Sequence, residues 1–412
     1  MRPEIPESET MWPASRMWST LSHYHRRGWR WRRVLGEYRP GTVRPGDGAR
    51  RVLLVRLDAI GDFVLWSGAA KVLRSWLGAD THVTLAANAT WADMARDAGI
   101  ADDVWPVRRR ALEWDGRYRD ELHSRVSGGG FSTAINAVFT REMLLGDSVV
   151  RWSRAPERIG SEGDGSLLPP RERRWADGWY TRLTPVSAGP MHESERNAEF
   201  LRSLGVPFAG VPAPALCVRP VLPARLDGLR EGYFVVFAGA GHPGRRWSPE
   251  GFAAVSRYVQ EKTGWRPVLL GDADDARMAR SVAGDVPGAI VLTGETSVPE
   301  LASVIQRARL VLTNETSAVH LAAATGVRSV CITGGGHWQR FVPYPASLGL
   351  AADLVEVVSM VQDMTCFNCN WRCVLPHVDG EALPCVSRVP VERVIGAVDR
   401  VLSRMMVAQP NG

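Results

Sequence analysis

Two carboxylates lie close together just after the first strongly apolar run of the chain. The run RVLLVRL (51–57) leads into Asp58-Ala59-Ile60-Gly61-Asp62, where a helical pattern begins. A carboxylate at such a point suits a general base that removes a proton from a hydroxyl group. The alternative is structural, because an acid in the first helical turn can cap free N–H groups and interact favourably with the helix dipole. Asp62 is therefore a candidate catalytic base, with helix capping as the second interpretation.

A glycine-rich loop follows another apolar run in the second half of the chain. Residues 239–244 read G-A-G-H-P-G, which fits the G-x-G-x-x-G string of dinucleotide-binding proteins. Pro243 and Pro249 delay the next helix, so that the fit is weak. The glycines still let backbone amides approach an anion, and two arginines follow them directly. We expect this loop to bind a diphosphate through Gly239, Ala240, Gly241, Arg245 and Arg246.

A third polar loop, Asn314-Glu315-Thr316-Ser317-Ala318-Val319-His320, leads from an apolar run into a helical pattern. Thr316 or Ser317 can cap this helix, whose free N–H groups attract anions. Glu315 is placed to accept hydrogen bonds from sugar or ribose hydroxyls. His320 lies one turn beyond Thr316 on the same helix face, as a ligand contact or as a packing residue.

A fourth loop, Thr333-Gly334-Gly335-Gly336-His337, follows the next apolar run. Its glycines have no side chain that would keep a ligand away from the backbone. Gly334 and Gly335 could therefore close over phosphates, and a flexible surface loop is the alternative.

Apolar strands and amphipathic helices alternate along the chain and must position these loops. The predicted strands are 51–57, 81–87, 131–139, 233–239, 266–272, 289–294, 309–314 and 328–334. The Arg-, Gly- and Pro-rich stretches 107–130 and 151–190 are expected to be loops or short irregular elements. The alternation stops at a Pro-rich segment (206–224) and then restarts, which predicts two α/β domains with parallel, doubly wound sheets. Ligands of such sheets bind at the carboxyl ends of the strands, so the cleft between the halves is the expected site.

These patterns divide the chain into five parts. They are a basic Trp/Arg-rich N-terminal extension (1–50), an N-terminal domain (51–205), a Pro-rich linker (206–228), a C-terminal domain (229–387) and a C-terminal helix with a tail (388–412).

The sequence resembles glycosyltransferase family 9, the heptosyltransferase family. The segments that carry the resemblance are RVLLVRLDAIGD, FAGAGHPGRRWSPEGF and VLTNETSAVHLAAATGVRSVCITGGG, with ETSVPELASVIQRARLVLTN also in register. They occur in the family's order and spacing, and the resemblance covers roughly residues 50–400. It implies the GT-B fold, in which two Rossmann-like domains face a central cleft. The nucleotide-sugar donor would bind mainly to the C-terminal domain and the acceptor mainly to the N-terminal domain.

The resemblance also implies roles for single residues in an inverting transfer that needs no metal or other cofactor. Asp62 would be the base that deprotonates the acceptor hydroxyl. Arg245, where the family usually has Lys, would neutralise the leaving diphosphate, and one acid would hold a ribose hydroxyl. The remaining donor contacts would come from Glu315, Thr316, Ser317 and His320. The candidates for the acid that holds the ribose hydroxyl are Asp272, Asp274 and Asp275, and Asp275 is the predicted one.

Two departures from the family pattern bear on the sugar. Glu315 stands where the family has Asp, and Ser317 where it has Gly, which reshapes the sugar pocket. We therefore expect heptose or another hexose-like sugar, moved to lipopolysaccharide or another cell-surface glycan. The alternatives are a non-catalytic sugar-nucleotide-binding protein of the same fold, and an NAD-dependent oxidoreductase based on the G-x-G-x-x-G string alone.

Four cysteines lie close together near the C-terminus, with the spacing C-x2-C-x3-C-x11-C (366–385). In a reducing compartment this spacing is compatible with a small structural zinc site. Reduced thiols in a packed loop, or a disulfide, are the alternatives. The predicted ligands are Cys366, Cys369, Cys373 and Cys385.

The positive charge of the chain is concentrated at its N-terminus. The formal net charge is +6, and residues 1–50 hold ten Arg against five acidic residues. This segment contains RRGWRWRR (26–33), which suits an anionic membrane surface where a lipid-linked acceptor would lie, or a helix packed on the domain. No signal peptide and no apolar window of about 20 residues are recognisable. We expect a cytoplasmic protein, in part at the inner face of the cytoplasmic membrane, with no nucleic-acid partner.

Overall fold

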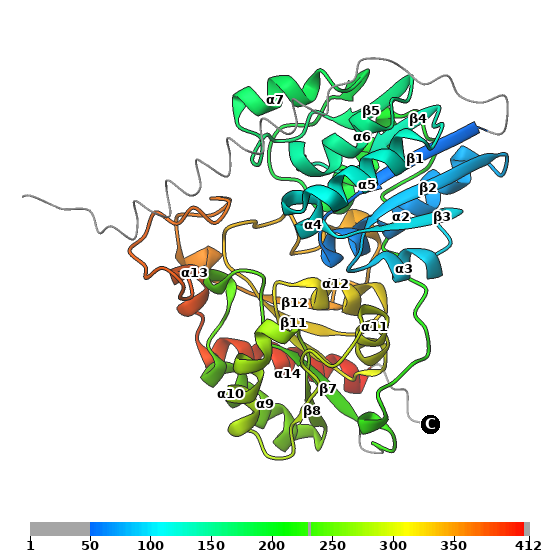
Figure 1. Ribbon diagram of the computed structural model, residues 1–412. Coiled ribbons are helices and arrows are strands. Elements are labelled where there is room, and N and C mark those ends of the chain that lie inside the picture. The colour runs from blue at the N-terminus through cyan, green and yellow to red at the C-terminus, as the bar shows by residue number, and fades with distance from the viewer. Residues whose placement is uncertain (1–49, 230–231, 408–412) are drawn as a thin grey trace, which may run out of the picture. The chain divides into compact units, whose positions relative to one another are not determined.

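Two six-stranded parallel sheets organise the protein, one in each half of the chain (Figure 1). The computed structural model describes residues 50–229 and 232–407, which lie within one compact unit. The N-terminal segment with RRGWRWRR, and with it the predicted membrane contact, lies outside the described residues.

The first sheet has the strand order β3-β2-β1-β4-β5-β6. Its central strand β1 is the predicted apolar run, and Val52, Leu53, Leu54 and Val55 are all buried because helices cover both faces. The strands of this sheet are β1 (Arg50–Arg56), β2 (Thr81–Asn88), β3 (Asp103–Val107), β4 (Thr133–Asn136), β5 (Glu157–Ser161) and β6 (Arg182–Thr184). The helices of this half are α2 (Ile60–Leu77), α3 (Ala92–Asp97), α4 (Arg109–Trp114), α5 (Gly116–Ser127), α6 (Ser148–Trp152), α7 (Pro170–Asp177) and α8 (Glu193–Ser203).

The second sheet repeats this arrangement with the order β12-β11-β10-β7-β8-β9. Its strands are β7 (Tyr233–Phe237), β8 (Arg266–Leu269), β9 (Ile290–Val291), β10 (Val311–Asn314), β11 (Ser329–Ile332) and β12 (Val355–Val358). The helices are α9 (Pro249–Thr263), α10 (Ala276–Gly284), α11 (Val298–Arg307), α12 (Ser317–Ala324), α13 (Pro384–Ser387) and α14 (Val391–Val407). The predicted pair of doubly wound parallel sheets is therefore confirmed.

Local signals explain why α9 begins late after β7. Ser248 caps the helix by accepting a hydrogen bond from the Gly251 N–H, and Pro249 occupies the first helical position. The helix ends at Gly264, whose φ of 72° is easily adopted by glycine. Residues 238–248 therefore remain a loop at the carboxyl end of β7.

The two halves share a continuous apolar core around α2 and α12. Phe63 and Trp66 of α2 belong to the same buried cluster as Ala318, Leu321 and Ala322 of α12. Because α2 begins at the end of β1 and α12 at the end of β10, this packing holds the two strand ends against each other. The C-terminal helix α14 packs into the core of the second half through Val394, Ala397, Val398 and Val401.

The structure corrects the prediction for the two Arg-, Gly- and Pro-rich stretches. The stretch 107–130 contains the 12-residue helix α5, which Asp115 caps by accepting from the N–H groups of Arg117 and Tyr118. The stretch 151–190 contains strand β5 and the edge strand β6. Helix α5 buries few apolar residues, chiefly Leu122 and Val126, so its periodicity is weak in the sequence. The edge strand β12 was not predicted.

None of the helices within 50–229 and 232–407 combines the length and the apolar character that crossing a bilayer requires.

Candidate functional site

The order of strands reverses at the same place in both sheets. In the first sheet the reversal lies between β1 and β4, and in the second between β7 and β10. The predicted loops leave the carboxyl ends of β1, β7 and β10, which is where doubly wound sheets bind ligands. A cavity of about 460 Å³, here the central cavity, is lined by loops from both halves. The predicted site residues that line it are Asp62, Ala240, Gly241, Arg245, Asp275, Glu315, Thr316, Ser317 and His320.

The other predicted residues lie around the cavity without lining it. Gly239 lets the Asp275 carboxylate approach the backbone, because a Cβ atom at Gly239 would lie 2.0 Å from Asp275 Oδ2. Arg246 donates to the Ala240 carbonyl at 3.0 Å and pairs with Asp275 at 3.4 Å, so it holds the loop. Gly334 and Gly335 are covered by other side chains, among them Trp371 and Phe367, instead of facing the central cavity.

The glycine-rich loop does not adopt the dinucleotide-binding geometry. In that geometry the third glycine belongs to a helix that begins directly after the strand. Here Gly244 lies in a single 3₁₀ turn, Pro243–Arg245, and the helix begins only at Pro249. The loop instead presents Ala240, Gly241 and Arg245 to the cavity.

Asp62 lies in the first turn of α2 and lines the cavity, but it does not occupy the N-cap position. Ala59 is the N-cap residue and makes no side-chain hydrogen bond. The Asp62 carboxylate forms a hydrogen bond with the backbone of Ala59. Burial raises the pKa of Asp62, and the nearby Glu193 carboxylate raises it further, while Arg56 and Arg340 lower it. A carboxylate with a raised pKa is a stronger proton acceptor than a free aspartate.

A buried arginine organises the acidic groups beneath Asp62. Arg56, at the end of β1, is fully buried and pairs with Asp58 at 2.9 Å and with Glu193 at 3.7 Å. It also donates to the Ala137 carbonyl and to Asn197 Oδ1. Burial raises the pKa of Asp58, and repulsion by the nearby Asp62 and Glu193 carboxylates raises it further, while Arg56 lowers it. The resulting pKa is about 7.

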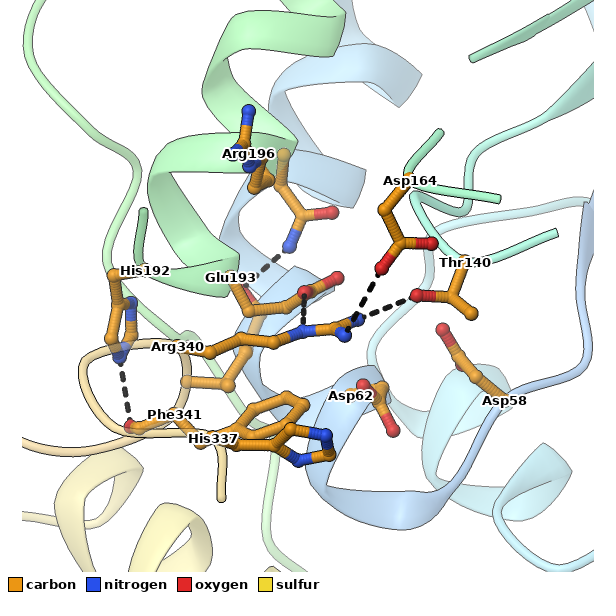
Figure 2. Close-up of polar contacts among 12 residues, drawn as sticks. Asp58, Asp62, Thr140, Asp164, His192, Glu193, Arg196, His337, Arg340 and Phe341 are labelled. Carbon is orange, nitrogen blue, oxygen red and sulfur yellow. Dashed lines mark hydrogen bonds and ion pairs between the residues drawn. The ribbon is translucent and has the colours of Figure 1, made fainter. Parts of the chain in front are cut away.

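Arg340 joins the second half of the chain to this acidic group (Figure 2). Its Nε lies 3.3 Å from Glu193 Oε2, its Nη2 donates to Thr140 Oγ1 at 2.8 Å, and its Nη1 lies 3.9 Å from Asp164. The backbone repeats the connection, because the Glu193 N–H donates to the Arg340 carbonyl at 2.8 Å. Arg340 therefore brings a cation close to Asp62 from the other half.

Arg245, from the second half of the chain, lines the same cavity as Asp62. Its Nη2 donates to both the carbonyl and the carboxylate of Glu315, at 2.7 and 2.8 Å, and its guanidinium lies 5.1 Å from the Trp371 ring centre. Among the described residues Arg245 Nε has no hydrogen-bond partner although it is buried. Glu315 also accepts from Thr333 Oγ1 at 2.6 Å, and burial raises its pKa. In this arrangement Glu315 orients Arg245, and the remaining guanidinium donors suit an anion.

The start of α12 completes this side. Thr316 caps the helix by accepting from the Ala318 N–H, so the positive end of α12 faces the cavity. His320 Nδ1 shares a hydrogen bond of 2.6 Å with the Tyr344 hydroxyl. Burial lowers the pKa of His320 to about 3, so the ring is neutral. Of the three acids proposed for a ribose hydroxyl, Asp272 and Asp275 line the cavity and Asp274 does not.

Four residues of this site were not predicted from the sequence. They are Arg56, Glu193, Arg340 and Tyr344. Arg56 carried a signal, because it is a lone cation at the end of an otherwise apolar buried strand, and such a charge needs buried partners. The other three come from segments whose sequence shows no functional pattern.

The cysteine segment packs beside the site without forming the predicted metal centre. Within 50–229 and 232–407 no group of three or more His, Cys, Asp or Glu side chains is arranged to hold a metal ion. Cys366, Cys369, Cys373 and Cys385 are all free and partly buried, and burial raises the pKa of Cys385. The segment contributes Trp371 and Asn370 to the surroundings of Arg245 and His337 instead. Metal analysis of the purified protein tests the zinc prediction, and less than about half an equivalent would end it.

The fold and the site together define a class. Two doubly wound sheets hold a cavity between their strand ends, with a carboxylate from one half and an arginine and a helix N-terminus from the other. This arrangement is that of the GT-B fold.

Comparisons with known proteins agree with this class. Residues 205–367 match the model of glycosyltransferase family 9 (heptosyltransferase). No curated protein matches the chain in sequence. The predicted resemblance to glycosyltransferase family 9 is confirmed, and the family model covers most of the second half of the chain.

Solved structures of this type share the fold at low sequence identity. A glycosyl transferase family 9 structure from Veillonella parvula DSM 2008 is 19% identical with a TM-score of 0.64, covering 87% of this chain and 98% of its own. The ADP-heptose lipopolysaccharide heptosyltransferase II of E. coli is 15% identical with a TM-score of 0.60, covering 86% and 99%. The E. coli heptosyltransferase WaaC with ADP-2-deoxy-2-fluoro heptose is 18% identical with a TM-score of 0.58, covering 86% and 99%. At these identities the likeness establishes the fold.

Proposed function

We propose that this protein transfers a sugar, with inversion, from a nucleotide-diphosphate donor to a hydroxyl group of lipopolysaccharide or another cell-surface glycan. The observation that carries the proposal is the division of the central cavity. Asp62 comes from one half, while Arg245 and the start of α12 come from the other. ADP-heptose is the first donor to test, because WaaC, which shares the fold, holds an ADP-heptose analogue. Heptose or another hexose-like sugar remains open, because Glu315 and Ser317 depart from the family pattern.

The chemistry follows from the two sides of the cavity. The Asp62 carboxylate takes the proton of the acceptor hydroxyl as its oxygen attacks the anomeric carbon. The new C–O bond forms on the face opposite the diphosphate, and the bond to the diphosphate oxygen breaks. Arg245 and the N-terminus of α12 stabilise the negative charge that develops on the leaving diphosphate. The nucleoside diphosphate departs, and the proton remains on Asp62.

The proposal includes three statements about conditions. Transfer needs no metal or cofactor, so that EDTA should leave the rate unchanged. The enzyme acts in the cytoplasm, at the inner face of the membrane where a lipid-linked acceptor would lie. Residues 1–50 make the membrane contact, and deleting 1–49 should weaken binding to anionic vesicles. Unchanged vesicle binding would overturn that contact without touching the catalytic proposal.

Asp62→Asn tests the proposal directly. The amide keeps the size of the side chain but accepts no proton, so transfer should fall by about 10² to 10⁴-fold. ADP affinity, measured by titration calorimetry, should stay within about twofold, because Arg245 and α12 are untouched. Asp93→Asn is the control, since Asp93 is exposed and does not line the central cavity, and it should leave transfer within about twofold. Near-normal transfer by Asp62→Asn would remove Asp62 as the base.

A further inference from the structure

A second cavity of about 540 Å³ lies next to the central cavity. The consecutive residues Arg340 and Phe341 lie at the boundary between the two cavities, because Arg340 lines the second cavity and Phe341 lines the central cavity. Figure 2 shows Asp62 close to Arg340 and Phe341. The second cavity therefore adjoins the central cavity, which Asp62 lines, through the segment that carries Arg340 and Phe341. On the proposed function, this is the place of the acceptor.

The second cavity is lined by two arginines, and the first of them has no free charge to offer. Arg196 is nearly buried, with its Nη1 donating to the Ser187 carbonyl at 2.6 Å and its Nη2 to the Gly189 carbonyl at 2.7 Å. Glu199 Oε2 lies 3.3 Å from the same Nη1. The Phe139 ring covers the guanidinium at 4.5 Å. Its charge and both of its terminal nitrogens are thus already engaged within the protein.

Arg340, the second arginine, is matched in the same way. Glu193 and Asp164 pair with its guanidinium, and Thr140 accepts a hydrogen bond from its Nη2. The two guanidinium groups that line the cavity are thus paired with three carboxylates, Asp164, Glu193 and Glu199, of which Glu193 is shared with the buried Arg56. A carboxylate or phosphate placed here would lose water without gaining a free cation, which is unfavourable.

The other polar groups of the second cavity are neutral. Burial lowers the pKa of His337 to about 4, so the ring carries no charge at neutral pH. Asn368 and Asn370 expose amide groups, and Trp338 adds an aromatic surface. Amides that donate and accept, beside an aromatic face, suit the hydroxyls and the C–H face of a sugar ring.

We propose that the second cavity selects an uncharged glycan, a sugar unit without carboxylate or phosphate, as the acceptor. That the bound glycan is the acceptor rests on the proposed function. That the cavity prefers an uncharged glycan rests on the pairing of Arg196 and Arg340 with carboxylates.

Binding to the full-length protein saturated with ADP tests this selection. The probes are methyl β-lactoside, the matching disaccharide with a glucuronic acid unit, and lactose phosphate, measured by saturation-transfer NMR and calorimetry. The neutral disaccharide should bind at least about tenfold more tightly than either anionic probe. Equal or tighter binding of an anionic probe overturns the proposal, and so does the absence of binding by all three. Failure of ADP itself to bind would instead count against the proposed function.

A double variant tests the cause of the selection. Asp164→Asn with Glu199→Gln keeps the hydrogen-bond acceptors but leaves the two arginines facing one carboxylate. The affinity for the anionic probes should then rise about tenfold while that for the lactoside stays within about twofold. The matched control is Asp353→Asn with Glu356→Gln, which removes two carboxylates paired with Arg328 and with Arg400 and Arg404, away from both cavities. An unchanged preference in the first variant would show that the paired charges do not set it.

Discussion

Glu193→Gln should move the pH dependence of transfer toward lower pH. Glu193 is buried at the start of α8, and its carboxylate raises the pKa of Asp62. The other charged groups that act on Asp62 are Arg56 and Arg340, which lower its pKa, and Asp58, with which it is mutually repulsive. Glutamine keeps the hydrogen-bond acceptor for Arg340 but removes one negative charge. The Asp62 carboxylate then loses a repulsive neighbour and its proton becomes easier to remove.

The size of the shift follows from Coulomb's law. For an order-of-magnitude separation of about 8 Å and an effective dielectric constant of about 20, two carboxylates repel each other by about 2 kcal/mol. Water in the cavity reduces this, so we expect a fall of about one pKa unit, which is about 1.4 kcal/mol. The base must be ionised to accept a proton, so the rate falls as the pH drops through the pKa of Asp62. One unit below the wild-type midpoint, the wild type keeps about a tenth of its base ionised and the variant about half, so the variant should be about fivefold faster relative to its plateau.

The assay is kcat/KM for transfer from ADP-heptose, measured from about pH 5 to pH 9. The midpoint of the acid limb is the readout, because partial loss of folded protein lowers the plateau but leaves the midpoint in place. Glu195→Gln is the matched control, since Glu195 lies on the same helical turn and bonds instead with the His192 backbone and Ser347. An acid limb that stays in place or moves to higher pH in Glu193→Gln would refute the electrostatic account of Asp62.

Three further variants test single contacts of the site. Arg245→Ala should weaken ADP binding by about 10- to 100-fold in calorimetry, because charge-assisted hydrogen bonds to the diphosphate are lost, and unchanged affinity would remove Arg245 from the site. Tyr344→Phe leaves His320 Nδ1 without its 2.6 Å partner, so the free energy of unfolding should fall by about 1–3 kcal/mol in a denaturant titration, and an unchanged midpoint would contradict this. Gly61→Ala would place a Cβ atom 2.9 Å from His320 Cδ2, so it should lower the melting temperature and the donor affinity together, with an overpacking cost of about 1–3 kcal/mol. Gly284→Ala, whose Cβ would meet nothing within 4 Å, is its control, and equal behaviour of the two glycine variants would refute the contact.

The predicted loops came from patterns that depend on neighbouring residues. The apolar run before Asp62, the glycines and prolines of 239–249 and the capping Thr316 each act within a few residues, so they were readable along the chain. The structure brings Asp62, Arg245, Glu315, Thr316 and His320 to one cavity. The rule that doubly wound sheets bind ligands at their strand ends was enough to predict that meeting.

Other features of the site depend on contacts between distant segments. Arg340 lies 147 residues from its partner Glu193, and Tyr344 reaches His320 from a loop without regular structure. Glu315, expected to hold a hydroxyl, turns its carboxylate to Arg245 and Thr333. Gly334 and Gly335, expected to close over phosphates, lie under the cysteine segment. No local pattern indicates these pairings, because each depends on how two loops pack.

The sequence by itself determined the two doubly wound sheets, the loops that line the central cavity and the resemblance to glycosyltransferase family 9. These follow from periodicity and from short-range backbone preferences, which are properties of consecutive residues. Only the tertiary structure decided which charges are free. Burial and the nearby Glu193 carboxylate raise the pKa of Asp62. Long-range pairing engages Glu315 with Arg245 and matches the arginines of the second cavity with carboxylates. The strength of a charge depends on the water and the partners around it, and these are set by residues far apart in the chain.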